Sequence, residues 1–192
     1  MLVLLLGLLI FLGAHSLRIF ADDWRGRQVA RLGVKRWKGL YALVSVVGFV
    51  LICWGFGLAR QQPAVLYVPP PGLRHLNALF TLLAFVLFFA ARVPRNHFKA
   101  KLGHPQVLAV LLWASGHLLA TGMLHDAVLF GAFLLWAVVL FAASRRRDRR
   151  EGTRYPQGTL AGDALDVAIG LAAWIAFAFW LHLWLIGVNP LA

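Results

Sequence analysis

The chain has 192 residues, of which 61% are hydrophobic, and its mean hydropathy is positive. Only about half of the residues of a soluble globular domain are apolar, so this composition excludes a soluble domain and indicates an integral membrane protein. The formal net charge of +12 comes from 19 lysines and arginines against 7 aspartates and glutamates. The basic runs lack interleaved aromatics and any groove-reading motif, so we expect no nucleic-acid partner.

Six apolar segments have about the 20 residues needed to cross ~30 Å of hydrocarbon at about 1.5 Å per residue. We place them at Val3–Phe20, Gly39–Leu58, Leu73–Ala91, Pro105–Met123, Asp126–Ala143 and Leu165–Val188. The sequence therefore predicts an all-α fold, a polytopic transmembrane bundle of about six helices that forms one domain over residues 1–192. The first segment has no basic region before it and no small-residue cleavage site after it, which favours a helix over a signal peptide.

The connecting segments carry their own signals. Asp22–Lys38 mixes tryptophans with basic residues, which is typical of an amphipathic helix in the head-group plane. The run Pro69–Pro71 predicts a rigid, extended connector. The short loop around Gly122–His125 predicts a tight antiparallel hairpin between the fourth and fifth helices. The arginine-rich stretch Ser144–Asp163 is predicted to be a mobile loop.

The lysines and arginines are concentrated in alternate loops. Seven lie between Arg18 and Lys38, four between Arg92 and Lys101, six between Arg145 and Arg154, and two elsewhere. By the positive-inside rule these three loops are cytoplasmic, and both termini lie on the periplasmic side. Membrane lipid with anionic head groups is the partner that these loops predict.

Histidines are the candidate site residues. His15 and His117 lie within predicted spanning segments, where an ionisable side chain is too costly to be left without a partner. His182 lies in the last segment, His75 at the outer start of the third, and His104 at the inner start of the fourth. Counted at about 1.5 Å per residue, His117 is closer in depth to His182 than to His15, so the residues alone leave the pairing open.

The alternatives for these histidines are haem or no metal. Neutral imidazole is the commonest axial ligand of haem iron. Cys53 is the single cysteine and is expected to be buried, which excludes cysteine-based zinc and iron–sulfur sites. Asp126, Asp163 and Asp166 fall at predicted helix ends, so a carboxylate-rich di-iron site is not expected.

Small and polar residues within the segments have structural interpretations. Gly7 and Gly13, or Gly48 and Gly55, are expected to permit close helix contact. Candidates for orienting a histidine through its second ring nitrogen are Asn77, Ser45, Ser115 and Thr121.

Four groups of residues, in this order, carry a resemblance that covers nearly the whole chain. They are Gly13–Ser16; Tyr67, Pro69 and Pro70 followed by Leu73–His75; His104 and Pro105 with Trp113 and His117; and Trp180–Gly187. Together they resemble the NnrU family, which also includes the plant 15-cis-zeta-carotene isomerase Z-ISO.

The resemblance implies haem b with His15 and His117 as the iron ligands, and we keep His182 as the substitute ligand. Ala114 stands where the plant isomerase has a cysteine that acts as an alternative ligand, so the resemblance does not extend to that redox switch. The ending around His182 is more similar to bacterial NnrU proteins, which are associated with nitrite and nitric oxide metabolism. It implies a multi-pass protein of the bacterial inner membrane.

Three hypotheses about function follow. The first is a haem b membrane protein that works with denitrification proteins, or that acts as a redox-gated cis–trans isomerase of a lipophilic polyene such as zeta-carotene. The second is a non-catalytic scaffold or assembly factor with structural histidines. The third is an S-adenosylmethionine-dependent membrane methyltransferase, suggested by the His104–Pro105 element. This third class requires an arginine with paired glutamates, where the chain offers only Arg154, Tyr155 and Pro156 beyond Glu151.

Overall fold

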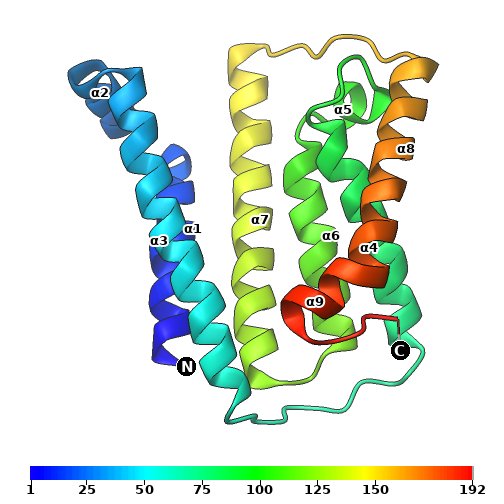
Figure 1. Ribbon diagram of the computed structural model, residues 1–192. Coiled ribbons are helices and arrows are strands. Elements are labelled where there is room, and N and C mark those ends of the chain that lie inside the picture. Colours follow the sequence, from blue (N-terminus) through cyan, green and yellow to red (C-terminus); the bar gives the residue numbers. More distant parts are fainter. Residues whose placement is uncertain (192) are drawn as a thin grey trace. The chain divides into compact units, whose positions relative to one another are not determined.

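The structure, a computed structural model, describes residues 1–191, and its regular elements are helices (Figure 1). They are α1 (Leu2–Phe20), α2 (Asp22–Leu32), α3 (Val34–Arg60), α4 (Leu73–Ala90), α5 (His97–Leu102), α6 (Pro105–Ala120), α7 (Leu124–Glu151), α8 (Leu160–Ala176), the π-helical turn η1 (Phe177–Leu181) and α9 (His182–Ile186). Extended pairing within residues 1–191 amounts to one isolated bridge, between Val65 and Met123. The predicted all-α fold is confirmed.

Five helical segments are long and apolar enough to cross a membrane. They are α1, α3, α4, α7 and the continuous run Leu160–Ile186. The sixth predicted segment is α6, which is apolar but has only 16 residues, or about 24 Å of rise. It begins at Pro105, whose fixed φ suits the first helical position, and ends where Thr121 becomes extended. These helices support a multi-pass membrane protein.

Internal contacts divide the chain into two compact units. The first comprises residues 1–66 and 123–136, and the second comprises residues 67–122 and 137 to the C-terminus. The expectation of one domain over residues 1–192 stays a prediction.

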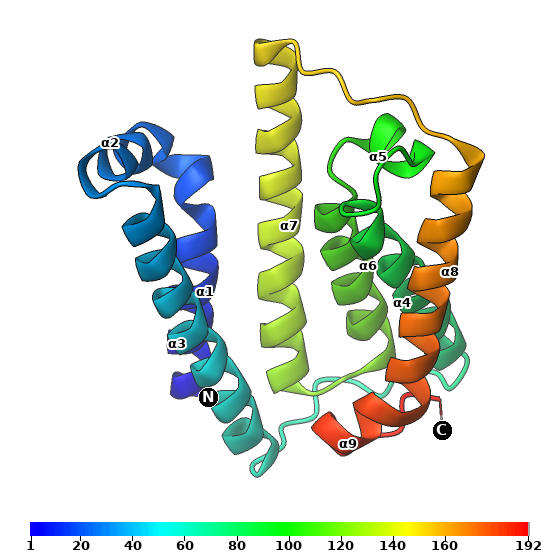
Figure 2. The ribbon, with the colours of Figure 1, turned by 45° about the horizontal axis from the view of Figure 1, so that its top comes forward.

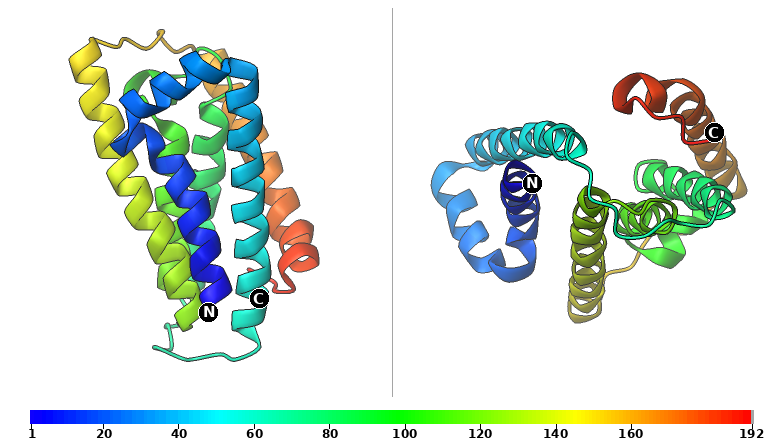
Figure 3. Two further views of the ribbon diagram at one scale, coloured as in Figure 1. Left: turned by 90° about the vertical axis from the view of Figure 1, so that its left-hand side faces the viewer. Right: turned by 90° about the horizontal axis from the view of Figure 1, so that it is seen from below.

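In the first unit, α1 and α3 lie side by side through glycines (Figure 3, left). A Cβ atom on Gly7 would lie 2.6 Å from the backbone nitrogen of Ile52, and one on Gly48 would lie 2.8 Å from that of Phe11. Gly55 faces the backbone of Leu4 in the same way. Only glycine permits two helices to approach this closely, which confirms the expectation for these three residues. The expectation for Gly13 is wrong, because no atom of the neighbouring helices that the structure describes lies within 4 Å of its Cβ position.

The segment after α1 forms the amphipathic helix α2, which crosses between the ends of α1 and α3 (Figure 3, left). Trp24 of α2 meets Trp37 of α3 edge to face, with ring centroids 6.0 Å apart. Helix α3 begins at Val34, five residues before the predicted start, because Gly33 ends α2 with φ of +78° and the chain resumes helical geometry at once. Cys53 of α3 is exposed, so the expectation that it is buried is wrong.

In the second unit, α4 packs against both α6 and α8 (Figure 2). Glycines again set the spacing. Gly116 of α6 faces Asn77 and Phe80 of α4, and a Cβ on Gly170 of α8 would lie 2.7 Å from the Cα of Val86.

Helix α7 continues through the arginine-rich stretch to Glu151, so the predicted loop from Ser144 to Asp163 is wrong in extent. Arginine is a good helix former, and basic residues are favourable at a helix C-terminus. Ser144 and Asp148, one turn apart, are buried on one side of this extension. The connection to α8 is therefore the short segment 152–159, which Figure 2 shows as a coil without helical turns.

Candidate functional site

His15 lies on α1 among aromatic rings. Its Nδ1 is 2.7 Å from the carbonyl oxygen of Phe11, one turn earlier. The Phe11 ring stacks on the imidazole with centroids 4.2 Å apart, and the rings of Tyr41 and Trp136 have centroids at 5.3 and 6.2 Å. The imidazole is half-buried, and three aromatic side chains surround it.

His117 on α6 has the same local geometry. Its Nδ1 is 2.8 Å from the carbonyl oxygen of Trp113, also one turn earlier. Thr121 donates its hydroxyl to the carbonyl of His117 rather than to the ring, and Ser45 donates to the carbonyl of Tyr41. Nδ1 of His15 and Nδ1 of His117 are thus each held by a backbone carbonyl, and the hydroxyls of Thr121 and Ser45 donate to the backbone. That one of the polar side chains orients a histidine stays a prediction.

His182 begins α9, directly after the π-helical turn η1. Its Nδ1 is 2.7 Å from the carbonyl oxygen of Val188, and its ring meets Phe177 with centroids 5.7 Å apart. The chain folds back to place that carbonyl because Gly187 adopts φ of +75°, which favours glycine. A π-helical turn shifts the register of the residues that follow it, and such turns are frequent at functional sites.

These three imidazoles share a tautomer. A carbonyl oxygen only accepts, so the neutral ring carries its hydrogen on Nδ1 and its lone pair on Nε2, the nitrogen that can bind a metal. A hydrogen bond from the other ring nitrogen is the usual support of a metal-ligating histidine. His117 and His182 belong to the same unit. His15 belongs to the first unit.

Across residues 1–191, no three histidine, cysteine, aspartate or glutamate side chains gather as a possible metal site. His75 is exposed at the start of α4. His125 is buried beside Asp126, with 3.6 Å between its Nε2 and the carboxylate, and packs on the Phe56 ring at 5.1 Å.

A polar cluster that the sequence did not reveal lies where α6 begins. Nε2 of His104 is 2.8 Å from Oδ2 of Asp148, and the Tyr155 hydroxyl donates to the same oxygen at 2.9 Å. Nη1 of Arg145 is 3.7 Å from that oxygen. Burial, reinforced by the hydrogen bond and the negative charge of Asp148, raises the pKa of Tyr155 to about 12. The cluster joins the start of α6, the end of α7 and segment 152–159. The sequence did not predict it, because residues 144–163 were expected to form a mobile loop.

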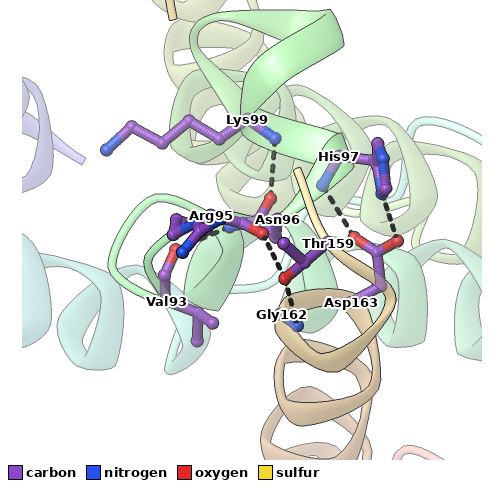
Figure 4. A network of polar contacts seen from close by, with 8 residues as sticks. All are labelled: Val93, Arg95, Asn96, His97, Lys99, Thr159, Gly162 and Asp163. Carbon is purple, nitrogen blue, oxygen red and sulfur yellow. Dashed lines mark hydrogen bonds and ion pairs between the residues drawn. The ribbon is translucent and has the colours of Figure 1, made fainter. Parts of the chain in front are cut away.

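A second network joins the α4–α5 turn to α8 (Figure 4). Asn96 is 1% exposed; its amide donates to the carbonyls of Ala90 and Val93, and its Oδ1 accepts from the backbone of Lys99. Arg95, with φ of +53°, turns its carbonyl toward the backbone and hydroxyl of Thr159. The cap formed by Asn96 was available as a sequence signal, since asparagine before a short helix is a preferred N-cap.

His97 and Asp163 complete this network. The backbone N–H of His97 donates to Oδ1 of Asp163, and its Nδ1 lies 2.7 Å from Oδ2. Asp163 does lie in the first turn of a helix, as expected, but Asp166 does not lie at a helix end. It is the seventh residue of α8 and is fully buried, because α8 begins at Leu160 and not at the predicted Leu165.

The fold and these residues define a class: a multi-pass membrane protein whose helices carry histidines held by backbone carbonyls. The profile of a family described as NnrU protein matches residues 3–190, nearly the whole chain. The chain therefore belongs to the NnrU protein family, which confirms the resemblance. No curated protein and no solved structure gives a significant match. The relation to the plant isomerase stays a prediction.

Proposed function

We propose that this NnrU protein binds haem b, with His15 and His117 as ligands to the iron and with His182 as the substitute ligand. One observation carries the proposal. His15 and His117 each hold Nδ1 against the carbonyl four residues earlier, at 2.7 and 2.8 Å, which assigns the lone pair to Nε2. Two histidines on different helices with this same arrangement could hold the iron of haem b.

The surroundings of these histidines suit a flat, apolar macrocycle. The rings of Phe11, Tyr41 and Trp136 lie around His15, and Trp113 lies beside His117 with centroids 5.4 Å apart. The carbonyls of Phe11 and Trp113 fix the direction of each imidazole and increase its basicity. When bound, haem b supplies a redox-active iron.

The test is the absorption spectrum of the detergent-purified protein, oxidised and dithionite-reduced, after expression with ample haem. The wild type should show a Soret band that shifts on reduction. His15→Ala and His117→Ala should each weaken or move this band, while His182→Ala should retain it. His75→Ala, at an exposed position, is the matched control and should match the wild type.

The spectra of the variants distinguish the possible iron ligands. If His182→Ala and His117→Ala change the band while His15→Ala does not, His182 is the second ligand. A colourless wild-type protein refutes haem binding and leaves a non-catalytic scaffold with structural histidines, or an S-adenosylmethionine-dependent methyltransferase, as the functions to test.

We further propose that the protein resides in the bacterial inner membrane with both termini periplasmic, and that it acts in nitrite and nitric oxide metabolism. Family membership supports this assignment. The second candidate activity is a redox-gated cis–trans isomerase of a polyene. It requires that the conversion of 15-cis-zeta-carotene depend on the oxidation state of the protein.

A further inference from the structure

Asp166 of α8 lies in the interface that α8 forms with α4 and with the turn before α5. Its exposed fraction is 0%. Gly162 and Gly170 lie four residues before and after it, on the same face of the helix. Gly162 meets the backbone carbonyl of Arg95, and Gly170 meets the backbone of Val86. These close approaches enclose Asp166 between two backbones.

Both carboxylate oxygens of Asp166 are buried and have no hydrogen-bond partner among residues 1–191. The ionised form of the carboxylate is strongly disfavoured in this state, since neither a donor nor an opposite charge of the described residues offsets its lost hydration.

The charged groups of the surrounding elements are engaged elsewhere or exposed. Helix α4 carries no titratable side chain after His75, which is at its far end. Around the α4–α5 turn, Nζ of Lys99 donates to the carbonyl of Ala91, Arg92 lies over the Phe88 ring and reaches Gln106, Arg95 and Lys101 are exposed, and His97 binds Asp163.

A route to solvent begins one turn away. Asp163, three residues before Asp166, has a side chain that is 24% exposed, and its partner His97 is 41% exposed. Both line an open cavity of about 520 Å³ together with Phe98, Lys101, Leu102 and Leu160. Residues three apart on a helix are neighbours, so Asp163 is placed to exchange a proton between this cavity and Asp166.

We propose that Asp166 is a proton-binding site within the membrane, protonated in mildly acidic solution and loaded through the His97–Asp163 pair. A hydronium ion in the cavity protonates the His97–Asp163 pair and leaves as water, and the pair passes a proton to the carboxylate of Asp166, which becomes a carboxylic acid. This site does not depend on haem.

Dicyclohexylcarbodiimide tests this directly, because this apolar reagent adds to a protonated carboxyl group in an apolar environment. The purified full-length protein is treated at about pH 6 to 7 and mapped by peptide mass spectrometry. We expect one adduct on Asp166, none on the exposed Glu151, and none on this peptide in Asp166→Asn. Excess sodium chloride should not protect Asp166. Failure to label Asp166 in the folded wild type overturns the proposal, and protection by sodium overturns it in favour of a metal-cation site.

A second measurement does not depend on reagent access. Asp166→Asn replaces a neutral acid by a neutral amide of the same shape, so its thermal stability should match that of the wild type at about pH 4, where the unfolded chain also keeps much of this proton. As the pH rises from about 4 to 7, the wild type should lose stability relative to this variant, because the unfolded chain releases the proton that folded Asp166 holds. A stability difference that is the same at about pH 4 and about pH 7 shows that folding does not favour the protonated form of Asp166 and overturns the proposal.

Discussion

The glycine contacts between α1 and α3 make a quantitative prediction about Gly48→Ala. The added Cβ would lie 2.8 Å from the backbone nitrogen of Phe11, where ordinary contact begins at 3.4 Å, so α1 must retreat by about 0.6 Å at this level. Overpacking of this kind costs about 1–3 kcal/mol. Alanine returns about 0.8–1 kcal/mol in helix propensity, so the net change is a destabilisation of about 0–2 kcal/mol.

Gly57→Ala is the matched control on the same helix. Nothing lies within 4 Å of the Cβ position at Gly57, so only the propensity gain applies and this variant should be more stable than the wild type. Thermal unfolding of both variants in one detergent, followed by tryptophan fluorescence, gives the comparison. The two variants should differ by about 1–3 kcal/mol, since the clash is the term that separates them.

The same variant also tests the link from packing to the candidate site. Phe11, which must move, stacks on His15 at 4.2 Å and provides the carbonyl that holds its Nδ1. Gly48→Ala should therefore disturb the environment of His15, and Gly57→Ala should not. Equal stabilisation in both variants would refute the close approach of α1 and α3 and the reasoning built on it.

Two more predictions concern the polar networks of the second unit. Asn96→Ala removes the partners of two carbonyls and one backbone N–H, and at about 1–3 kcal/mol for each buried group should destabilise the protein by more than 2 kcal/mol in thermal unfolding. An effect below 1 kcal/mol would contradict this network. Tyr155→Phe removes the bond to Asp148, at a cost of about 1 kcal/mol, and speeds proteolysis of segment 152–159. Because the pKa of Tyr155 is raised to about 12 in the folded state, its contribution is complete below about pH 10 and is lost as pH rises toward 12. The stability difference between wild type and Tyr155→Phe should shrink over that range; a constant difference would count against the bond.

The membrane-spanning segments were predictable because they depend on apolar length, a property that sequence states directly. Starts at Leu2 and Leu73 fall within one residue of expectation. The end of α7 was not predictable from hydropathy, because Arg145–Glu151 is as compatible with a solvated helix as with a loop. The helix is favoured over the loop by the contacts of the buried Asp148 with His104 and Tyr155, and His104 is distant from it in sequence.

The site was predictable to the level of residue type. An ionisable group in an apolar segment identifies His15 and His117 without any geometry. The partners of their rings were not predictable, since polar side chains nearby in sequence were the expected orienters, whereas side chains on a helix lean back toward the preceding turn and there reach its carbonyl. The π-helical turn before His182 leaves no mark in composition, because Phe177–Leu181 is as apolar as the helix around it.

Asp166 shows how packing, and not composition, isolates a charge. The chain carries 19 lysines and arginines against 7 acidic residues, so basic side chains that could pair with an accessible carboxylate are in excess. Asp148 and Asp163, in the same unit, are both bonded to histidine. Asp166 stays apart because Gly162 and Gly170 draw the neighbouring backbones so close that no lysine or arginine side chain enters between them. Substituting either glycine by alanine would separate the two backbones and admit water to Asp166. Hydration would then favour the ionised form of this carboxylate.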